Sequence, residues 1–170
     1  MTWNCDSMNN TDVETILNDC LADLVNVEVL INRSSLSPNA RYLTNYALIK
    51  ACSTIERCFK KIIADRIENL ASIMSFYVNK EVRESSANPS YDKMLDFLAK
   101  YNPSWKNNFK ARVKGHADAH RIKSSLESLV NNRNTFAHTG SCACSFADVS
   151  NFYVDAVEFI NILDDVVMFP

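Results

Sequence analysis

Glycine is scarce in this chain of 170 residues, which holds 2 glycines and 4 prolines. Folds built from β-strands need many tight turns, and those turns depend on glycine and proline. The same scarcity excludes dinucleotide-binding folds and phosphate loops, because each requires several glycines in one segment and Gly115 and Gly140 stand alone. The sequence therefore favours an all-α fold. Its content of 47% hydrophobic and 22% charged residues is typical of a globular protein.

Apolar residues recur at helical spacing along the chain and predict a bundle of about five helices. We expect one domain over residues 1–170, because the length is that of an ordinary single domain. Residues 105–115 are ambiguous and suggest only a short helical turn. The expected helices are 11–32 with Thr11 as N-cap, 37–72 starting at Ser37-Pro38, 90–101 capped by Ser90, 117–140 ended by Gly140, and a last helix capped by Ser145 with Asp148 in its first turn.

Basic residues gather in one stretch, although the net charge of the chain is only −2. Residues 103–133 contain seven Lys and Arg against two acidic residues, whereas residues 145–170 contain five acidic residues and no Lys or Arg. A run of this kind usually forms a solvated helix face. The alternative is contact with RNA phosphates, which would make binding depend on salt.

Six cysteines occur in the chain, and its first residues, MTWNCDSMNN, are too polar for a secretory signal. Cys20, Cys52 and Cys58 fall in helical patterns and are expected in the core. We therefore expect a reducing, cytoplasmic location. No apolar run approaches the length that spans a membrane, so no membrane contact is expected.

Two groups of residues raise the question of a metal site. Cys142 and Cys144, with His138 nearby, could hold a metal or be redox-active, but no second ligand pair lies at zinc spacing. His116 and His120 could bind a metal on one helix face, but no third ligand is evident, and a solvated face is the alternative. We expect no metal and no cofactor.

The segment LVNNRNTFAHTG, from Leu129 to Gly140, places Arg133, Asn134 and His138 at the end of an apolar-striped helix. Asn134 and His138 are four residues apart and share a helix face. Arg133 and His138 are five apart, so they point about 140° away from each other on a straight helix. They can converge on one group if the helix unwinds near its end, or if two copies meet across a two-fold axis.

Arginine and histidine together suffice for RNA cleavage without a metal. Histidine can assist attack by the ribose 2′-OH on the adjacent phosphate, and arginine can stabilise the negative charge that develops. The products would be a 2′,3′-cyclic phosphate and a 5′-OH end, and DNA would not react. The structural alternative is a capped helix end, where Asn134 bonds backbone and His138 interacts with the helix C-terminus.

A carboxylate interrupts the apolar stripe of the second predicted helix. Glu56 lies on the same stripe as Cys52, Phe59 and Ile63, where a buried carboxylate must be paired or neutral. One interpretation is a helix edge in contact with water. The other is a partner for an arginine at a functional site.

The chain resembles the HEPN superfamily, which is marked by Arg, a polar residue and then His, with four to six residues between Arg and His. The segment 133–138 fits this pattern, and SLESLVNNRNTFAHTG from Ser125 resembles the RiboL-PSP-HEPN and MAE-type branches. YALIKACSTIERCFKKII from Tyr46 resembles their second helix, including Glu56. The region from Ser145 to Val166 resembles their last helix.

The resemblance implies a helical bundle that forms a homodimer, with two Arg-His motifs facing each other in a cleft. Many members are metal-independent endoribonucleases in toxin–antitoxin, defence or RNA-processing systems, so RNA and a cognate antitoxin or defence partner are implied. By position, Arg133 and His138 would be catalytic. Asn134 would orient His138 or the phosphate, and Glu56 would orient Arg133.

Two alternatives stay open beside this ribonuclease hypothesis. Some members of the superfamily lack activity and bind RNA, a nucleotide or a protein partner. A plain helical interaction domain is the other alternative. One toxin branch carries a modified tyrosine two residues after the histidine, but Gly140 stands there, so that regulation is not expected.

Overall fold

The computed structural model describes residues 8–33 and 39–169, and over these ranges it is all-α. It has seven α-helices, more than the five expected, together with two short helical turns, η1 and η2. The elements are α1 (Thr11–Arg33), α2 (Asn39–Leu70), η1 (Ser72–Met74), α3 (Ser75–Val78), η2 (Asn79–Arg83), α4 (Tyr91–Tyr101), α5 (Pro103–Gly115), α6 (Ala119–Thr139) and α7 (Phe146–Met168).

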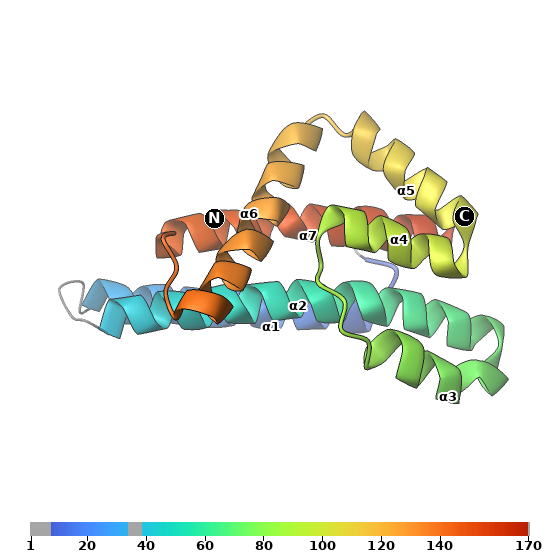
Figure 1. Ribbon diagram of the computed structural model, residues 1–170, viewed down its shortest axis with the longest axis horizontal. Coiled ribbons are helices and arrows are strands. Elements are labelled where there is room, and N and C mark those ends of the chain that lie inside the picture. Colours follow the sequence, from blue (N-terminus) through green and yellow to red (C-terminus); the bar gives the residue numbers. More distant parts are fainter. Residues whose placement is uncertain (1–7, 34–38, 170) are drawn as a thin grey trace.

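Helices α1 and α2 form a long antiparallel hairpin, and α7 runs alongside it (Figure 1). Helix α6 crosses α7 and α2 steeply, so that its C-terminal end lies over the N-terminal half of α2 (Figure 1). Helices α4 and α5 form a second hairpin, and the short α3 lies at the opposite end of α2 from the end of α6. Helix α6, which carries the Arg133–His138 motif, therefore packs against both α2 and α7.

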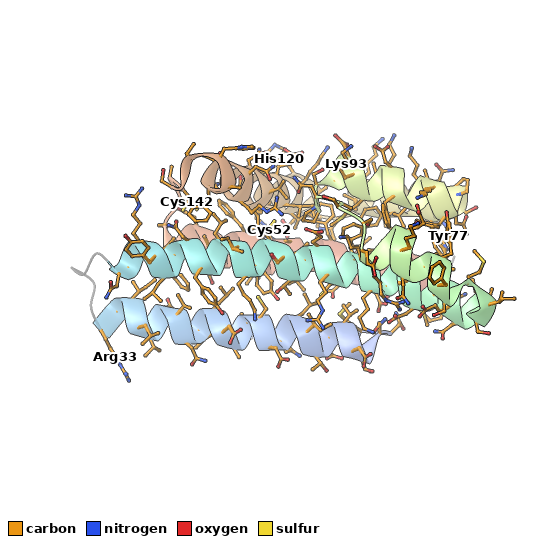
Figure 2. All side chains as sticks on the ribbon, turned by 60° about the horizontal axis from the view of Figure 1, so that its bottom comes forward. Arg33, Cys52, Tyr77, Lys93, His120 and Cys142 are labelled. Atoms are coloured by element: carbon orange, nitrogen blue, oxygen red, sulfur yellow. The ribbon has the colours of Figure 1, made fainter. Side chains whose placement is uncertain are left out.

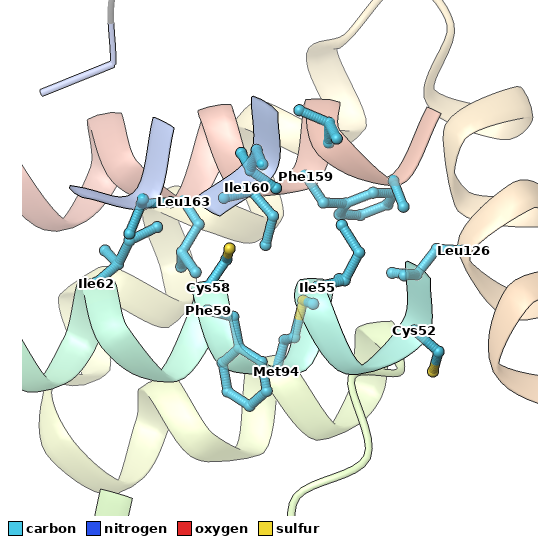
Figure 3. Close-up of a cluster of buried hydrophobic side chains, with 14 of the residues drawn as sticks. Cys52, Ile55, Cys58, Phe59, Ile62, Met94, Leu126, Phe159, Ile160 and Leu163 are labelled. Carbon is cyan, nitrogen blue, oxygen red and sulfur yellow. The ribbon is translucent and has the colours of Figure 1, made fainter. Parts of the chain in front are cut away.

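The core lies between α2 and α7 and is closed by α4 and α6. Ile55, Cys58 and Ile62 point from α2 toward Phe159, Ile160 and Leu163 of α7, and Phe59 points toward Met94 of α4 (Figure 3). All of these side chains are buried. Full burial of each large apolar side chain stabilises the fold by about 1.5–3 kcal/mol, so the contact between α2 and α7 is a main source of the stability of the bundle. Cys20, Cys52 and Cys58 are buried, as predicted.

Several expected helix boundaries change. The Asn10 side chain accepts a hydrogen bond from the Val13 N–H at 3.1 Å, so Asn10 and not Thr11 caps α1. Ser90 precedes α4 without a capping side-chain bond. The Ser37-Pro38 start of the second helix lies outside the described residues. Residues 103–115 form a full helix because Asn102 caps it and Pro103 is its first residue.

The last two predicted boundaries are confirmed. Gly140 ends α6 in the left-handed conformation with φ 71°, where a side chain would be strained. Ser145 and Asp148 form a reciprocal capping box at the start of α7. No helix among the described residues is long and apolar enough to cross a membrane.

The basic stretch turns partly inward toward the acidic α7. Arg112 lies 3.1 Å from a carboxylate oxygen of Asp165, and Arg121 bonds Asp155. Lys123 lies over the ring of Tyr91 at 4.6 Å. Arg112 and Arg121 stay about half exposed, but these contacts already occupy part of the positive charge between residues 103 and 133, so the stretch is less available to RNA than its sequence suggests.

Candidate functional site

The Arg-His motif occupies the last two turns of α6. The helix stays hydrogen-bonded to its end, where the Gly140 N–H donates to the Phe136 carbonyl at 2.8 Å. Unwinding before His138, one of the two routes to convergence, is therefore excluded. Arg133 and His138 of one copy point about 140° apart around α6.

Arg133 has few partners for a half-buried arginine. Its Nη1 donates to Oδ1 of the adjacent Asn134 at 3.1 Å, and its Nη2 lies 4.0 Å from Oε2 of Glu56. Its side chain is 35% exposed. A guanidinium carries five N–H donors, so most of its donor capacity remains open for an anion.

Glu56 is held by a lysine more closely than by the arginine. The Nζ of Lys60, one turn along α2, lies 2.6 Å from Oε1 of Glu56, and Lys60 is buried. Lys60 also donates to the carbonyl oxygen of Ser85. The carboxylate on the apolar stripe is thus paired, with Lys60 as its main partner and Arg133 at the limit of ion-pair distance.

The loop between η2 and α4 also contacts the motif. The Nδ2 of Asn88 donates to Oδ1 of Asn134 at 3.4 Å, while Ser85 of the same loop accepts from Lys60. Asn134 bonds side chains here and not the backbone of a capped helix end. The loop between η2 and α4 is therefore tied to both α2 and α6 beside Arg133.

Sequence reasoning missed Lys60 and Asn88. The four-residue spacing between Glu56 and Lys60 is that of a helical ion pair and could have identified the lysine. Asn88 lies 46 residues from Asn134 in a loop, where no local pattern indicates a long-range partner.

His138 is exposed in the last turn of α6. Within the described part of the chain it makes no hydrogen bond or ion pair, so both nitrogens of its imidazole are open to a ligand or to a second molecule. One copy thus brings Arg133, Asn134 and Glu56 together, whereas His138, one turn after Asn134, points about 140° away from Arg133.

The chain is similar to a known protein family. A family model described as RiboL-PSP-HEPN matches residues 14–168. The chain belongs to the RiboL-PSP-HEPN family. No curated protein and no solved structure matches it.

The RiboL-PSP-HEPN match confirms the superfamily resemblance and extends it. The matched range begins in α1 and ends in α7, so the family pattern covers nearly the whole bundle. The motif segment, Glu56 and the last helix all fall inside it.

An exposed apolar stripe lies on α2 next to the motif of this RiboL-PSP-HEPN chain. Tyr42, Tyr46 and Ile49 are 72%, 50% and 42% exposed. Their spacing puts them on the side of α2 that also carries Glu56. Large exposed apolar side chains along one helix face are typical of a protein contact.

A shallow groove of about 570 Å³ continues along α2 from Glu56. Four of its side chains are basic and one is acidic. The groove is lined by Ser53, Glu56, Arg57, Lys60, Lys61 and Arg83.

The cysteines near the motif contact α2. Cys142 donates its thiol hydrogen to Oδ1 of the buried Asn45 at 3.1 Å, and Figure 2 shows it above α2, nearer to the N-terminal end of that helix than Cys52. Burial raises the pKa of the Cys52 thiol to about 11, and the nearby positive charge of Arg133 offsets only part of this rise. Burial and the Cys142 thiol raise the pKa of Cys144 to about 12, so both sites hold neutral thiols at physiological pH.

No group of three or more His, Cys, Asp and Glu side chains is arranged for a metal in residues 8–33 and 39–169. His116 follows the end of α5 with extended backbone, and its Nδ1 accepts from the Asp118 N–H at 3.1 Å. His120 belongs to α6. The two histidines therefore do not share one helix face.

Proposed function

We propose that this RiboL-PSP-HEPN chain is a metal-independent endoribonuclease that acts as a homodimer. One observation carries the proposal. Arg133 lies beside an ion pair that already uses Glu56, so its guanidinium keeps open donors for a phosphate, on the same helix as a His138 that pairs with none of the described residues. Lys60 matters here because a carboxylate without it would bind Arg133 and neutralise it.

A dimer would bring an Arg133 and a His138 to the same phosphate. An intact α6 directs Arg133 and His138 about 140° apart within one copy, so one copy does not present both to one phosphate. A two-fold axis near the end of α6 would put His138 of one copy opposite Arg133 of the other. The exposed stripe of Tyr42, Tyr46 and Ile49 beside the motif supports a protein contact at this place.

In the proposed reaction His138 accepts the proton of the ribose 2′-OH as the oxygen attacks the phosphorus. Arg133 binds the non-bridging phosphate oxygens and stabilises their growing charge, and Asn134 and Glu56 position its guanidinium. The bond from phosphorus to the 5′ oxygen breaks and that oxygen takes a proton from water, which leaves a 2′,3′-cyclic phosphate and a 5′-OH end. A toxin or defence effector with a cognate partner is the biological role we propose for it.

The test is incubation of the purified protein with mixed single-stranded and structured RNA in excess EDTA. We expect cleavage to cyclic-phosphate ends by the wild type and none by His138→Ala or Arg133→Ala. Equal cleavage by all three proteins would place the activity elsewhere or in a contaminant. Absence of cleavage by a folded dimer would contradict the proposed ribonuclease activity.

The second candidate is a non-catalytic HEPN module that binds RNA, a nucleotide or a protein partner. The separation of Arg133 and His138 within one copy favours it, since an open arginine binds an anion without a histidine. A protein that binds RNA through Arg133 but leaves it intact would support this alternative.

A further inference from the structure

We infer that the groove along α2 binds the sugar–phosphate backbone of an RNA strand next to the bond that is cleaved. This inference rests on the proposed function and extends it from the reacting phosphate to the rest of the substrate. It assigns binding to the face of α2 from Ser53 to Lys61, and not to the basic stretch of residues 103–133.

The groove begins at the candidate site. Glu56 lines it and also lies 4.0 Å from Arg133, so the two features share a side chain. From residue 53 to residue 61 the helix rises about 12 Å, which is enough to contact more than one phosphate. A strand whose phosphate sits at Arg133 would therefore continue along this face.

The charged side chains that line the groove are mainly basic. Lys61 pairs with Asp12 and Asp65, and Arg83 pairs with Asp65 and Glu68. These three carboxylates line a different depression near the start of α1, which Lys61 also reaches. Glu56 is the one carboxylate among the six residues of the groove, and Lys60 neutralises it.

Arg57 is the part of the groove most open to a ligand. It is exposed, and within the described residues it has no hydrogen bond or ion pair. Its guanidinium presents a planar fork of donors that fits a phosphate. By contrast, the fold already uses Lys61 and Arg83 in ion pairs that join α2 to its neighbours, so Arg57 is the side chain of the groove on which the inference rests.

The experiment measures binding separately from cleavage. A fluorescent single-stranded RNA with 2′-O-methyl groups throughout cannot react, so its dissociation constant reports binding without cleavage, and the Arg57 variants show the share of the groove. We compare Arg57→Gln with Arg41→Gln, which removes another exposed arginine from the same helix, far from the groove. Thermal unfolding followed by circular dichroism checks that both variants fold.

We expect Arg57→Gln to weaken binding about five-fold at 0.1 M salt and to reduce the slope of log K against log salt by about 0.7, because one phosphate contact is lost. Arg57→Glu should weaken it further, and Arg41→Gln should leave it unchanged. Equal affinity of the wild type, Arg57→Gln and Arg57→Glu would overturn the inference, as would a wild type that binds no RNA.

The cleavage assay distinguishes the two proposals. If the wild type binds the methylated RNA through Arg57 but cuts no natural RNA, the groove stands and the ribonuclease fails. If it cuts RNA and Arg57→Gln raises KM about five-fold without changing kcat, both stand. If the wild type cuts RNA and both Arg57→Gln and Arg57→Glu match it in KM, the ribonuclease stands and the groove fails.

Discussion

Helix α6 carries two arginines, 12 residues apart, in opposite situations. Arg121 bonds Asp155 of α7 through one nitrogen and lies 3.0 Å from Asp118 through the other. Arg133 lies 4.0 Å from a carboxylate that a lysine already holds at 2.6 Å. The same side chain on the same helix is used for structure in one place and left open in the other.

The difference lies in the carboxylates and their neighbours. Asp155 is buried, and besides Arg121 it accepts from the hydroxyl of Ser125 at 2.6 Å, so removal of the arginine would leave a poorly solvated charge. Glu56 keeps Lys60 whether or not Arg133 is present. An arginine is available for chemistry when the acid beside it has another partner.

Loss of Arg133 should have the largest effect, and it should be on activity. We expect Arg133→Gln to reduce RNA cleavage at least 100-fold, because the developing phosphate charge loses its donor. Its free energy of unfolding should stay within about 0.5 kcal/mol of the wild type, since Glu56 remains paired. Cleavage rates and denaturant unfolding measured on one preparation check both; a large loss of stability would contradict the comparison.

Disruption of the exposed stripe of Tyr42, Tyr46 and Ile49 on α2 should show whether cleavage needs the second copy. Ile49→Asp puts a charge into the proposed dimer contact and should weaken the dimer at least 100-fold, with cleavage lost in parallel. Sedimentation and cleavage rates measure the two effects. Val25→Asp, at an exposed valine of α1, is the control and should remain dimeric and active. Unchanged dimerisation in Ile49→Asp would exclude this interface.

Loss of Arg121 should lower stability and leave activity unchanged, the opposite of the effect expected for Arg133. We expect Arg121→Gln to lower the free energy of unfolding by about 2 kcal/mol, less than for a fully buried pair because Arg121 is itself exposed. Cleavage per folded molecule should be unchanged. In the double variant Arg121→Gln with Asp155→Asn, part of the loss should return, because no unpaired carboxylate remains. A double variant as unstable as the sum of the single ones would contradict this account.

The cap of α7 should give the smallest effect, and one that depends on pH. Hydrogen bonds from Ser145 hold the pKa of Asp148 below its ordinary value, so this contribution is present near neutral pH and is lost as pH falls through the lowered pKa. Ser145→Ala should cost about 1 kcal/mol at pH 7. Unfolding curves at pH 7 and pH 3 should show the difference between the variant and the wild type shrinking in acid.

The sequence alone determined the all-α class, the end of α6 at Gly140 and the capping box at Ser145, because glycine scarcity, helical periodicity and capping are local properties. It also indicated Arg133, Asn134, His138 and Glu56 as candidates, because a short motif with two flanking patterns can be read along the chain. It left residues 105–115 ambiguous and suggested only a short helical turn there, because the apolar stripe is weak and the helix depends on Asn102, Pro103 and packing against α4 and α7.

Only the tertiary structure decided which charges are used inside the fold. The pairing of Arg121 with α7, the capture of Glu56 by Lys60 and the contact of Asn88 with Asn134 depend on how α2, α6, α7 and a distant loop meet. The energy of a charge depends on its burial and on its neighbours in space, and neighbours from separate helices leave no periodic signal in the sequence. For that reason the open state of Arg133 appears in the fold and not in the motif.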